Sequence, residues 1–476
     1  MSSFAGLQLA QRGLNAAQQA MLVTGQNIIN VATPGYTRQR VEQASLAPAT
    51  ATFGSTGSPV GAGVTVTGIS RLGDVLLDTG VRTSAAAAGY ADVRAAAYTS
   101  LEDAWGEPGP TALSQKLTAF WSAWDVLATN TDEPGAGVAV LQAGRDVAAG
   151  LETARTAVTT QWSDRRAGVD SQVAQVNATA SRLADLNRAI STATGAGGAA
   201  NELIDERARL AEELASSAGA TARVEADGGM TVRLNGTWLV SGTAARTLVV
   251  TGPADAATGM AGPAAVGVAW QDAPGTPVPL TGGRLAGTLS VLAPADGSGT
   301  GGAIAQAAAA LDGIATGLAD AVNTAHAAGT TRAGSPAGAF FALDPGRPAA
   351  AGLSVVPADP SALATAAPGS GALDGSAAAA VARVGTGADS PDRRWAAAVA
   401  TLGTAARSAT GQQTITAAAA GAARAAQTAS GSVSLDEENV SLLAAQHAYQ
   451  AAARVLTTID DMLDILINRT GTVGLR

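Results

Sequence analysis

The side chains that could do chemistry are few and far apart in this chain. His326 and His447 are its two histidines, and neither belongs to an HExxH or His-x-His pair that would bind zinc. The chain also lacks a Gly-x-Ser-x-Gly turn for a serine nucleophile. Because it contains no cysteine, thiolate catalysis, disulfides and cysteine-based zinc sites are excluded. We therefore predict a protein that is not an enzyme and that needs no cofactor and no metal.

The acidic clusters fit helix surfaces better than acid–base catalysis. The three carboxylates at 436–438 follow Ser434 at a predicted helix start, where they favour the positive end of the helix dipole. The aspartates within 460–464 fall on one solvated helix face. His326 ends another helix, where a cation suits the negative end of the dipole, and His447 has a packing or surface position.

Binding of phosphate or of a polyanion is disfavoured by the charges. A Walker loop needs a Gly-Lys-Ser/Thr run, whereas Lys116, the only lysine, lies in SQKLT. Residues 61–63 resemble the start of a dinucleotide-binding loop, but no helix-opening glycine follows, so a turn is the better interpretation. The net charge of −9 offers no cluster of cations for nucleic acid or anionic lipid. We predict no nucleic-acid partner and no membrane partner.

The composition predicts an elongated, largely helical protein of roughly two to four domains. Much of its 47% hydrophobic content is alanine, which favours helix but buries little area, and aromatic residues are only 3%. The 57 glycines and 19 prolines must lie mostly in turns. No stretch approaches the ~18 apolar residues of a membrane span, and the first residues lack the basic and apolar regions of a cleavable signal.

The first 36 residues follow a heptad repeat that carries almost no charge. Large apolar side chains recur every seven residues, and mostly small ones fill the companion positions. The repeat consists of Leu7, Leu14, Met21 and Ile28, with Ala10, Ala17, Thr24 and Val31 as companions. Its glycines each cost about 1 kcal/mol of helix propensity relative to alanine. We therefore expect this helix to form only against partners on several sides.

Residues 435–467 carry a second heptad repeat with stronger apolar positions. Its two seam positions are filled by Leu435, Leu442, Tyr449, Leu456 and Leu463, and by Ala445, Ala452, Ile459 and Leu466. One interpretation is that the two chain ends form a coiled coil with each other. The alternative, from pattern alone, is two unrelated amphipathic helices in a globular core.

Between the ends, the pattern predicts strands inserted into a helical frame. Residues 74–194 and 201–216 read as helices, with a loop near 106–110 and a break at Pro134. Residues 221–282 alternate apolar and polar side chains, and Asp-Gly and Asn-Gly pairs predict hairpin turns between them. Helix returns at 301–327 and 393–429, whereas 330–390 reads as irregular.

Two segments resemble the end signatures of the flagellar rod and hook axial protein family. The first is GLNAAQQAMLVTGQNIINVATPGYTRQR, residues 13–40, and the second is residues 432–468, which begin SVSLDEENV. The first signature consists of an Asn-rich helix end and a TPGY turn, formed here by Asn27, Asn30, Thr33, Pro34, Gly35 and Tyr36. The LDEE start of the second segment, the Thr-Arg-Gln after the turn, NELIDERARL at 201–210 and GTWLVSG at 236–242 resemble the hook-associated members. A hook or distal-rod protein is the alternative.

This resemblance implies a mainly α fold with an inserted β domain. Its parts would be a terminal α-helical coiled coil formed by both chain ends, a long-helix middle domain and an outer antiparallel β domain. We place them at 1–45 with 431–476, at 46–220 with 283–340 and 391–430, and at 221–282. Residues 341–390 would be an irregular connector.

The resemblance also implies a structural role without catalysis. The chain would form the junction between hook and filament, as an extracellular part of the bacterial flagellum exported through the type III channel without a cleaved signal peptide. Copies would assemble in a ring through the coiled-coil termini. The implied partners are the hook protein, the next hook-associated junction protein and a flagellar export chaperone at the C-terminal helix.

Overall fold

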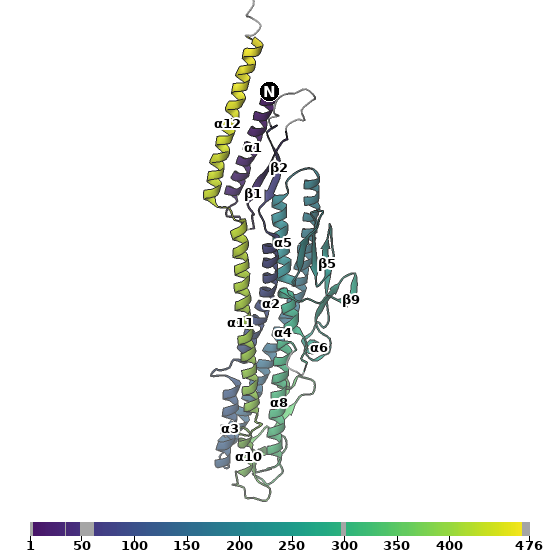
Figure 1. The fold of residues 1–476 in the computed structure, drawn as a ribbon. Helices are drawn as coiled ribbons and strands as arrows, with labels where there is room; N and C mark the ends of the chain where they lie inside the picture. Colours follow the sequence, from purple (N-terminus) through teal and green to yellow (C-terminus); the bar gives the residue numbers. More distant parts are fainter. Residues whose placement is uncertain (1–2, 34, 48–60, 297–300, 469–476) are drawn as a thin grey trace, which may run out of the picture.

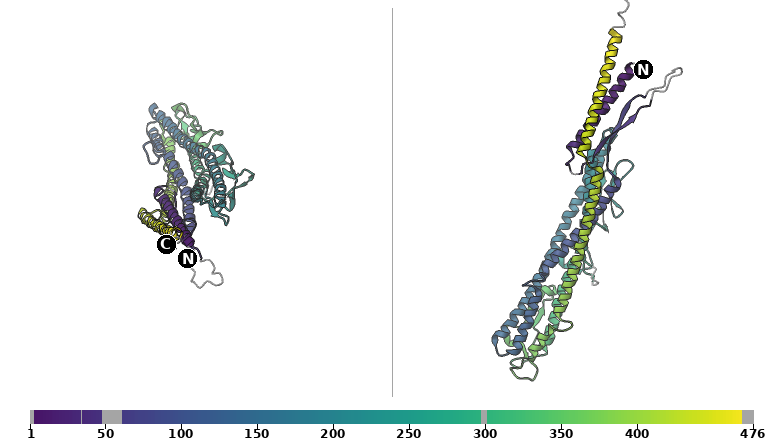
Figure 2. Two further views of the ribbon diagram at one scale, coloured as in Figure 1. Left: turned by 90° about the horizontal axis from the view of Figure 1, so that it is seen from above. Right: turned by 60° about the vertical axis from the view of Figure 1, so that its left-hand side comes forward.

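The computed structural model describes residues 3–33, 35–47, 61–296 and 301–468. It is an elongated, mainly helical molecule with small antiparallel sheets, as the composition predicted (Figure 1). Both chain ends lie at one end of the molecule, where two helices and a hairpin extend beyond a long helical body (Figure 2). Within the described ranges, no helix is both long and apolar enough to cross a membrane.

The extension, which we name the terminal unit, combines both ends of the chain. It consists of helices α1 (Ser3–Ile29) and α12 (Leu435–Asn468) and of strands β1 (Gln39–Ser45) and β2 (Val64–Arg71). The helices run antiparallel, because Gly6 faces Ile459 near one end of α1 and Asn27 contacts Glu438 near the other. Strands β1 and β2 form an antiparallel pair that packs on α1. The predicted boundary at residue 45 therefore separates two strands that the structure pairs.

The body is built from long helices, and capping residues, glycine and proline explain where several of them begin and end. Asp74 accepts hydrogen bonds from the first turn of α2, and Gly106 and Gly219 end α2 and α5 in the left-handed conformation. Pro134 begins α4, as predicted, because the first helical position needs no N–H donor. The main body helices are α2 (Val75–Trp105), α3 (Leu113–Thr129), α4 (Pro134–Gly195), α5 (Asn201–Ala218), α7 (Gly283–Leu292), α8 (Ala303–Ala327), α10 (Ser376–Val384) and α11 (Pro391–Gly431).

Two small antiparallel sheets lie on the flank of the body beside α4 (Figure 1). One contains β3 (Thr221–Val224), β4 (Met230–Leu234), β5 (Thr237–Ser241) and β6 (Ala244–Ala245). The other contains β7 (Leu248–Thr251), β8 (Gly267–Trp270) and β9 (Ala273–Pro277), with the short helix α6 (Ala256–Ala261) between β7 and β8. The Asn235-Gly236 turn has positive φ at both residues, which confirms the predicted hairpin.

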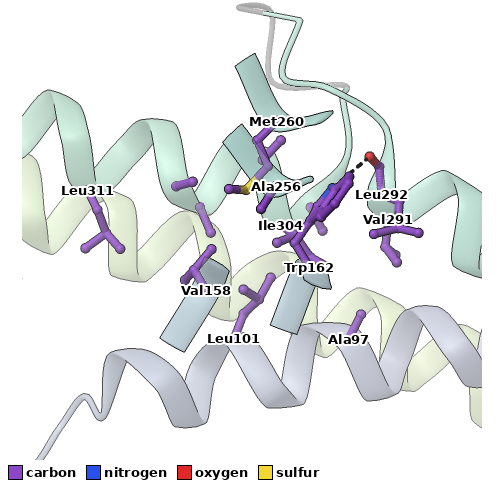
Figure 3. Packing of buried hydrophobic residues seen from close by; sticks show 14 of the residues in the cluster. Ala97, Leu101, Val158, Trp162, Ala256, Met260, Val291, Leu292, Ile304 and Leu311 are labelled. Atoms are coloured by element: carbon purple, nitrogen blue, oxygen red, sulfur yellow. Dashed lines mark hydrogen bonds between the residues drawn. The ribbon is translucent and has the colours of Figure 1, made fainter. Parts of the chain in front are cut away.

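The flanking sheets have no hydrophobic core of their own. Met230, Val232 and Leu248 belong to the same buried cluster as the helices, which extends from Ala97 to Leu402. Trp162 of α4 lies inside this cluster, packed among side chains of α2, α6, α7 and α8 (Figure 3). The helices and these strands share one core. The separate outer β domain at 221–282 therefore stays a prediction.

Residues 341–390, predicted to be an irregular connector, contain short helices and strands that pack on the body, and their place in the division of the chain stays a prediction. This region folds at the end of the body away from the terminal unit, where α3 and α10 also lie (Figure 1). Besides α10, it contains β11 (Phe341–Leu343), α9 (Ala349–Gly352), β12 (Leu353–Val355), the 3₁₀ turn η1 (Pro360–Ala362) and β13 (Ala364–Ala366), which pairs with β10 (Thr330–Thr331). Its elements are too short for a hydrophobic period, and they are held by packing of Phe341, Leu353 and Leu363 into the body core.

Candidate assembly interface

Helices α1 and α12, which carry the predicted seam residues, pack along each other. On both helices the large seam side chains are partly buried, namely Leu7, Leu14, Met21, Ile28, Leu442, Tyr449, Leu456, Ile459 and Leu463. The side chain of Leu435 is 46% exposed at the start of α12, and that of Leu466 is outside the described part of the structure. Full burial is confined mostly to small residues such as Ala10, Ala17 and Ala445.

Small residues let the two helices approach closely. A Cβ atom on Gly6 would lie 3.1 Å from Cδ1 of Ile459, and one on Gly13 would lie 3.8 Å from Cβ of Ala452. The close approach at Gly6 therefore gives that glycine a packing role, which offsets part of its cost in helix propensity, whereas a methyl group on Gly13 would make an ordinary contact. The role of this seam in joining subunits stays a prediction.

The terminal helices also carry a second set of apolar side chains that face solvent. These are Leu22 and Ile29 on α1, and Val440, Leu443, Val455, Met462, Ile465 and Ile467 on α12, each at least 47% exposed. On α12, Val440, Leu443 and Ile465 lie on the side opposite the seam with α1. Several large apolar side chains exposed on one pair of helices are typical of a surface that is covered by another protein.

The family-type motif at the end of α1 is centred on Asn27, whose side chain is 1% exposed. Its Nδ2 donates to the Gln39 carbonyl at 2.9 Å and to Oε2 of Glu438 at 3.0 Å. Its Oδ1 accepts from the Gln39 N–H at 3.0 Å and from the Tyr36 hydroxyl at 2.8 Å. Asparagine suits this position because one amide supplies two donors and two acceptor sites. It joins α1, the following turn, β1 and α12.

The turn after Asn27 is organised by the other motif residues. The Asn30 amide donates to the Gln26 carbonyl at 3.0 Å, and the Thr33 hydroxyl donates to Oδ1 of Asn30 at 3.1 Å. Gly35 has a φ of +82°, which explains why glycine occupies this position of the turn. Pro34 lies outside the described residues.

Glu438 corrects the interpretation of the acidic cluster at 436–438. It is 2% exposed, and its Oε1 accepts from Nε of Arg38 at 2.7 Å. The guanidinium of Arg38 also contacts Glu437 at 2.7 Å. Glu438 is therefore a buried partner of Arg38 and Asn27, and not only a helix-dipole partner. Sequence reasoning missed the contact because about 400 residues separate Arg38 from Glu438.

The first turns of α5 hold the terminal unit from the side of the body. Asp205 accepts from the Thr37 backbone N–H at 3.0 Å and forms an ion pair with Arg71. About one turn earlier on α5, Asn201 donates a hydrogen bond to the Gln39 side chain at 3.0 Å, and the Gln39 amide donates to Glu202 at 3.1 Å. We name these contacting side chains the junction network, which comprises Asn27, Tyr36, Thr37, Arg38, Gln39, Arg71, Asn201, Glu202, Asp205, Glu437 and Glu438.

The pKa of Tyr36 is raised by the surroundings of its hydroxyl in the junction network. Burial raises its pKa to about 12, and the carboxylates of Glu202, Asp205 and Glu438 add to the increase. Its hydroxyl therefore stays protonated and can keep donating to Asn27. In the sequence, the segments at 37–39 and 201–210 are both rich in polar and charged residues. No sequence pattern, however, links one segment to the other, so the network itself could not be predicted.

A hollow of about 530 Å³ lies beside the junction network. It is bounded by the turn at 30–37, the start of α2, α5 and the last turns of α11. Arg82 on α2 is mostly buried at its wall and Arg424 on α11 contacts Glu212 of α5. Burial lowers the pKa of Arg82, although Asp78 and Glu212 oppose the shift.

The histidines have structural surroundings in this fold. His326 is fully buried rather than a cation at a helix end, and this corrects its predicted role. Its Nδ1 donates to the Gly338 carbonyl at 2.8 Å, its Nε2 accepts from the Ala364 N–H at 3.0 Å, and burial lowers its pKa. His447 is exposed on α12. Among the described residues, no group of three or more His, Cys, Asp or Glu side chains is placed to hold a metal ion.

Comparison with known families places these features in a class. Residues 430–469, which include α12, match the model of the C-terminal region of flagellar basal body rod FlgEFG proteins, so the chain end is of the flagellar axial type. Residues 98–341, just over half of the chain, match the model of the flagellar hook-associated protein FlgK helical domain. The chain therefore belongs to the family of flagellar hook-associated protein FlgK.

Individual relatives agree with this membership. The chain is 34% identical to flagellar hook-associated protein 1 of Bacillus subtilis over 218 residues, which are 45% of this chain and 43% of that protein. It is 31% identical to the protein of the same name from Salmonella typhimurium over 242 residues, or 50% of this chain and 43% of that protein. The chain thus matches less than half the length of these relatives.

A solved structure has the same overall fold. The flagellar hook junction protein FlgK from Burkholderia pseudomallei superposes with a TM-score of 0.59 at 16% identity. The likeness covers 74% of this chain and 99% of that one. At this identity the comparison supports the fold alone.

Proposed function

We propose that this protein is a structural subunit of the bacterial flagellum that forms the junction between hook and filament. The observation that carries the proposal is the family match over the helical body, together with the axial-type match at the C-terminal helix. The relatives are named flagellar hook-associated protein 1, and the protein of similar fold from Burkholderia pseudomallei is named as a flagellar hook junction protein. The scattered histidines and the network of satisfied polar contacts favour a role without catalysis.

In this proposal, copies assemble in a ring through α1 and α12. The exposed apolar set on these helices supports it, because Ile29, Val440 and Met462 stay open to solvent in the single chain. Burial of such side chains against neighbouring copies would stabilise the ring by roughly 25 cal/mol per Å² of apolar surface removed from water. The hook protein on one side and the next hook-associated protein on the other are the expected neighbours.

Export precedes assembly in this proposal. The chain would leave the cell through the flagellar type III channel and act outside the cell. An export chaperone would hold the C-terminal helix, since the exposed apolar face of α12 needs cover before subunits meet. The absence of cysteine suits a chain that is exported unfolded, because no disulfide can form on the way.

Deletion and external addition test the proposal. A strain that lacks this protein should make complete hooks that carry no filament, and purified protein added from outside should restore filament growth. Complete filaments on the deletion strain would contradict the proposal. Loss of the hook itself would favour the alternative, a hook or distal-rod protein.

A further inference from the structure

We propose that the junction network is a releasable latch that sets the angle between the terminal unit and the body. The side-chain bonds that cross from one to the other converge on a single short segment, the first turns of α5. This inference concerns the chain itself and does not depend on the position of the protein in a flagellum.

The first support is that the terminal unit and the body are packed separately. The elements of the terminal unit pack on one another, whereas the buried cluster of the body extends from Ala97 to Leu402 and, among the described residues, contains none of α1, β1, β2 or α12. The chain passes between them through two short links, at 72–74 and 432–434, which are neither helix nor strand. Apolar packing therefore contributes little to the orientation of the terminal unit.

The second support is the chemistry of the crossing contacts. Asp205 holds Arg71 and the Thr37 N–H, while Asn201 and Glu202 hold the side chain of Gln39. Asn201 also donates to the Ile69 carbonyl at 3.2 Å. The bonds to Asp205 and Glu202 are charge-assisted, and all of these bonds are directional, so they define one orientation when they are formed. Water can replace them when they break, so opening the latch does not expose a hydrophobic core.

The third support is the hollow of about 530 Å³ beside the latch. The hollow is partly open to solvent, so water fills it and no packed side chain blocks movement into it. This hollow lies between the turn at 30–37 and the helices α2, α5 and α11, and Asp205 of the latch lines it. It gives the terminal unit room to tilt on its two links once the α5 contacts open.

Distance measurements between spin labels test the latch. Because the chain has no cysteine, Gln446→Cys on α12 and Ser408→Cys on α11 place one label on each part, both at exposed positions. The full chain should give one narrow distance distribution. The double variant Glu202→Gln with Asp205→Asn should broaden it or shift its maximum by several ångström. The control Asp272→Asn, at the exposed Arg246–Asp272 ion pair of the body, should leave it unchanged.

A second label pair separates tilting from unfolding. Gln18→Cys on α1 and Gln446→Cys report distances inside the terminal unit, and both positions are exposed. The latch requires that this distribution stay narrow in the double variant. The proposal is overturned if both pairs broaden together, if neither pair changes, or if the parent chain is already broad between α11 and α12.

Discussion

At the scale of single residues, Asn27 and His326 are both polar side chains that the fold removes from water, and both are fully hydrogen-bonded. Asn27, on α1, satisfies two donors and two acceptor sites with groups from β1, α12 and the turn between α1 and β1. His326 uses each ring nitrogen once, which fixes the neutral form with the proton on Nδ1. Burial of an unpaired polar group costs roughly 1–3 kcal/mol, so each of these side chains constrains the segments that it joins.

The neutral state of His326 predicts a pH dependence of stability. Its folded pKa lies below the usual value of 6.5, so the unfolded chain takes up a proton that the folded chain refuses. Its contribution is fully present above pH 6.5 and is lost as the pH falls, by up to about 1.4 kcal/mol per pH unit.

Urea unfolding at about pH 7.5 and 5.5 measures this effect around the ordinary histidine pKa. The free energy of unfolding should fall less between the two values in His326→Gln than in the parent. His447→Gln is the matched control at an exposed position and should behave like the parent. Equal slopes in all three proteins would show that His326 titrates normally.

Leu456 tests the seam between α1 and α12. Leu456→Asp should prevent assembly, because it places a carboxylate in a half-buried apolar seam and removes Leu packing, at a cost of about 2–4 kcal/mol. Asp461→Asn changes an exposed side chain and should cost within about 0.5 kcal/mol. Purified variants are added from outside to flagella that lack the protein, so that failure of export does not enter the result. Filament growth with Leu456→Asp at the parent level would refute the seam assignment.

At the scale of elements, the packing of α6 on α4 shows how a small helix is matched to one large side chain. A Cβ atom on Gly259 of α6 would lie 2.1 Å from Cζ2 of Trp162. Trp162 itself is fully buried and its Nε1 donates to the Leu292 carbonyl at 3.3 Å (Figure 3). The indole is thus held on one side by α7 and on the other by the bare backbone of α6.

Gly259→Ala should therefore destabilise the body. Alanine gains about 1 kcal/mol of helix propensity over glycine, but the clash with a fixed indole ring costs about 1–3 kcal/mol, so the clash wins. Gly275→Ala in β9 is the control, because no atom lies within 4 Å of the added methyl group. The midpoint of urea unfolding should fall for the first variant and stay near the parent for the second. An unchanged midpoint for Gly259→Ala would mean that Trp162 can move aside.

At the scale of the whole molecule, a body with its own core carries a terminal unit that has almost no large buried side chains. In the described part of α1 and α12 the fully buried apolar residues are Ala10, Ala16, Ala17, Val23 and Ala445. The terminal unit therefore has apolar surface left for contacts with other chains, whereas the body satisfies its apolar surface internally. This division suits a subunit whose ends assemble and whose body projects from the assembly.

Removal of the terminal unit tests this division. A chain of residues 72–431 should fold and should melt within about 2 °C of the body transition of the full chain, because no residue of its core is lost. The same chain added from outside should not restore filaments to flagella that lack the protein. Calorimetry and the filament assay measure the two outcomes. A body that unfolds without its ends would show that the terminal unit stabilises the core.

The sequence by itself determined the helices with a regular hydrophobic period and the turns marked by glycine, asparagine or proline. The heptads at both ends, the long helices, and the hairpin at Asn235-Gly236 were predicted because each depends on neighbours within a few turns of the chain. The family-type motif around Asn27 was also visible in the sequence. Its importance could be seen there, but its contacts could not.

Only the tertiary structure decided what those segments touch. The pairing of Arg38 with Glu438 and of Arg71 with Asp205 depends on chain closure over 400 and 134 residues, which leaves no local period to detect. The same reason explains His326, whose partners are Gly338 in a loop and Ala364 at the start of β13. It also explains the short elements of 341–390, which are held in place by packing against the body. Local propensity determines elements, whereas long-range burial and hydrogen bonding determine which elements meet.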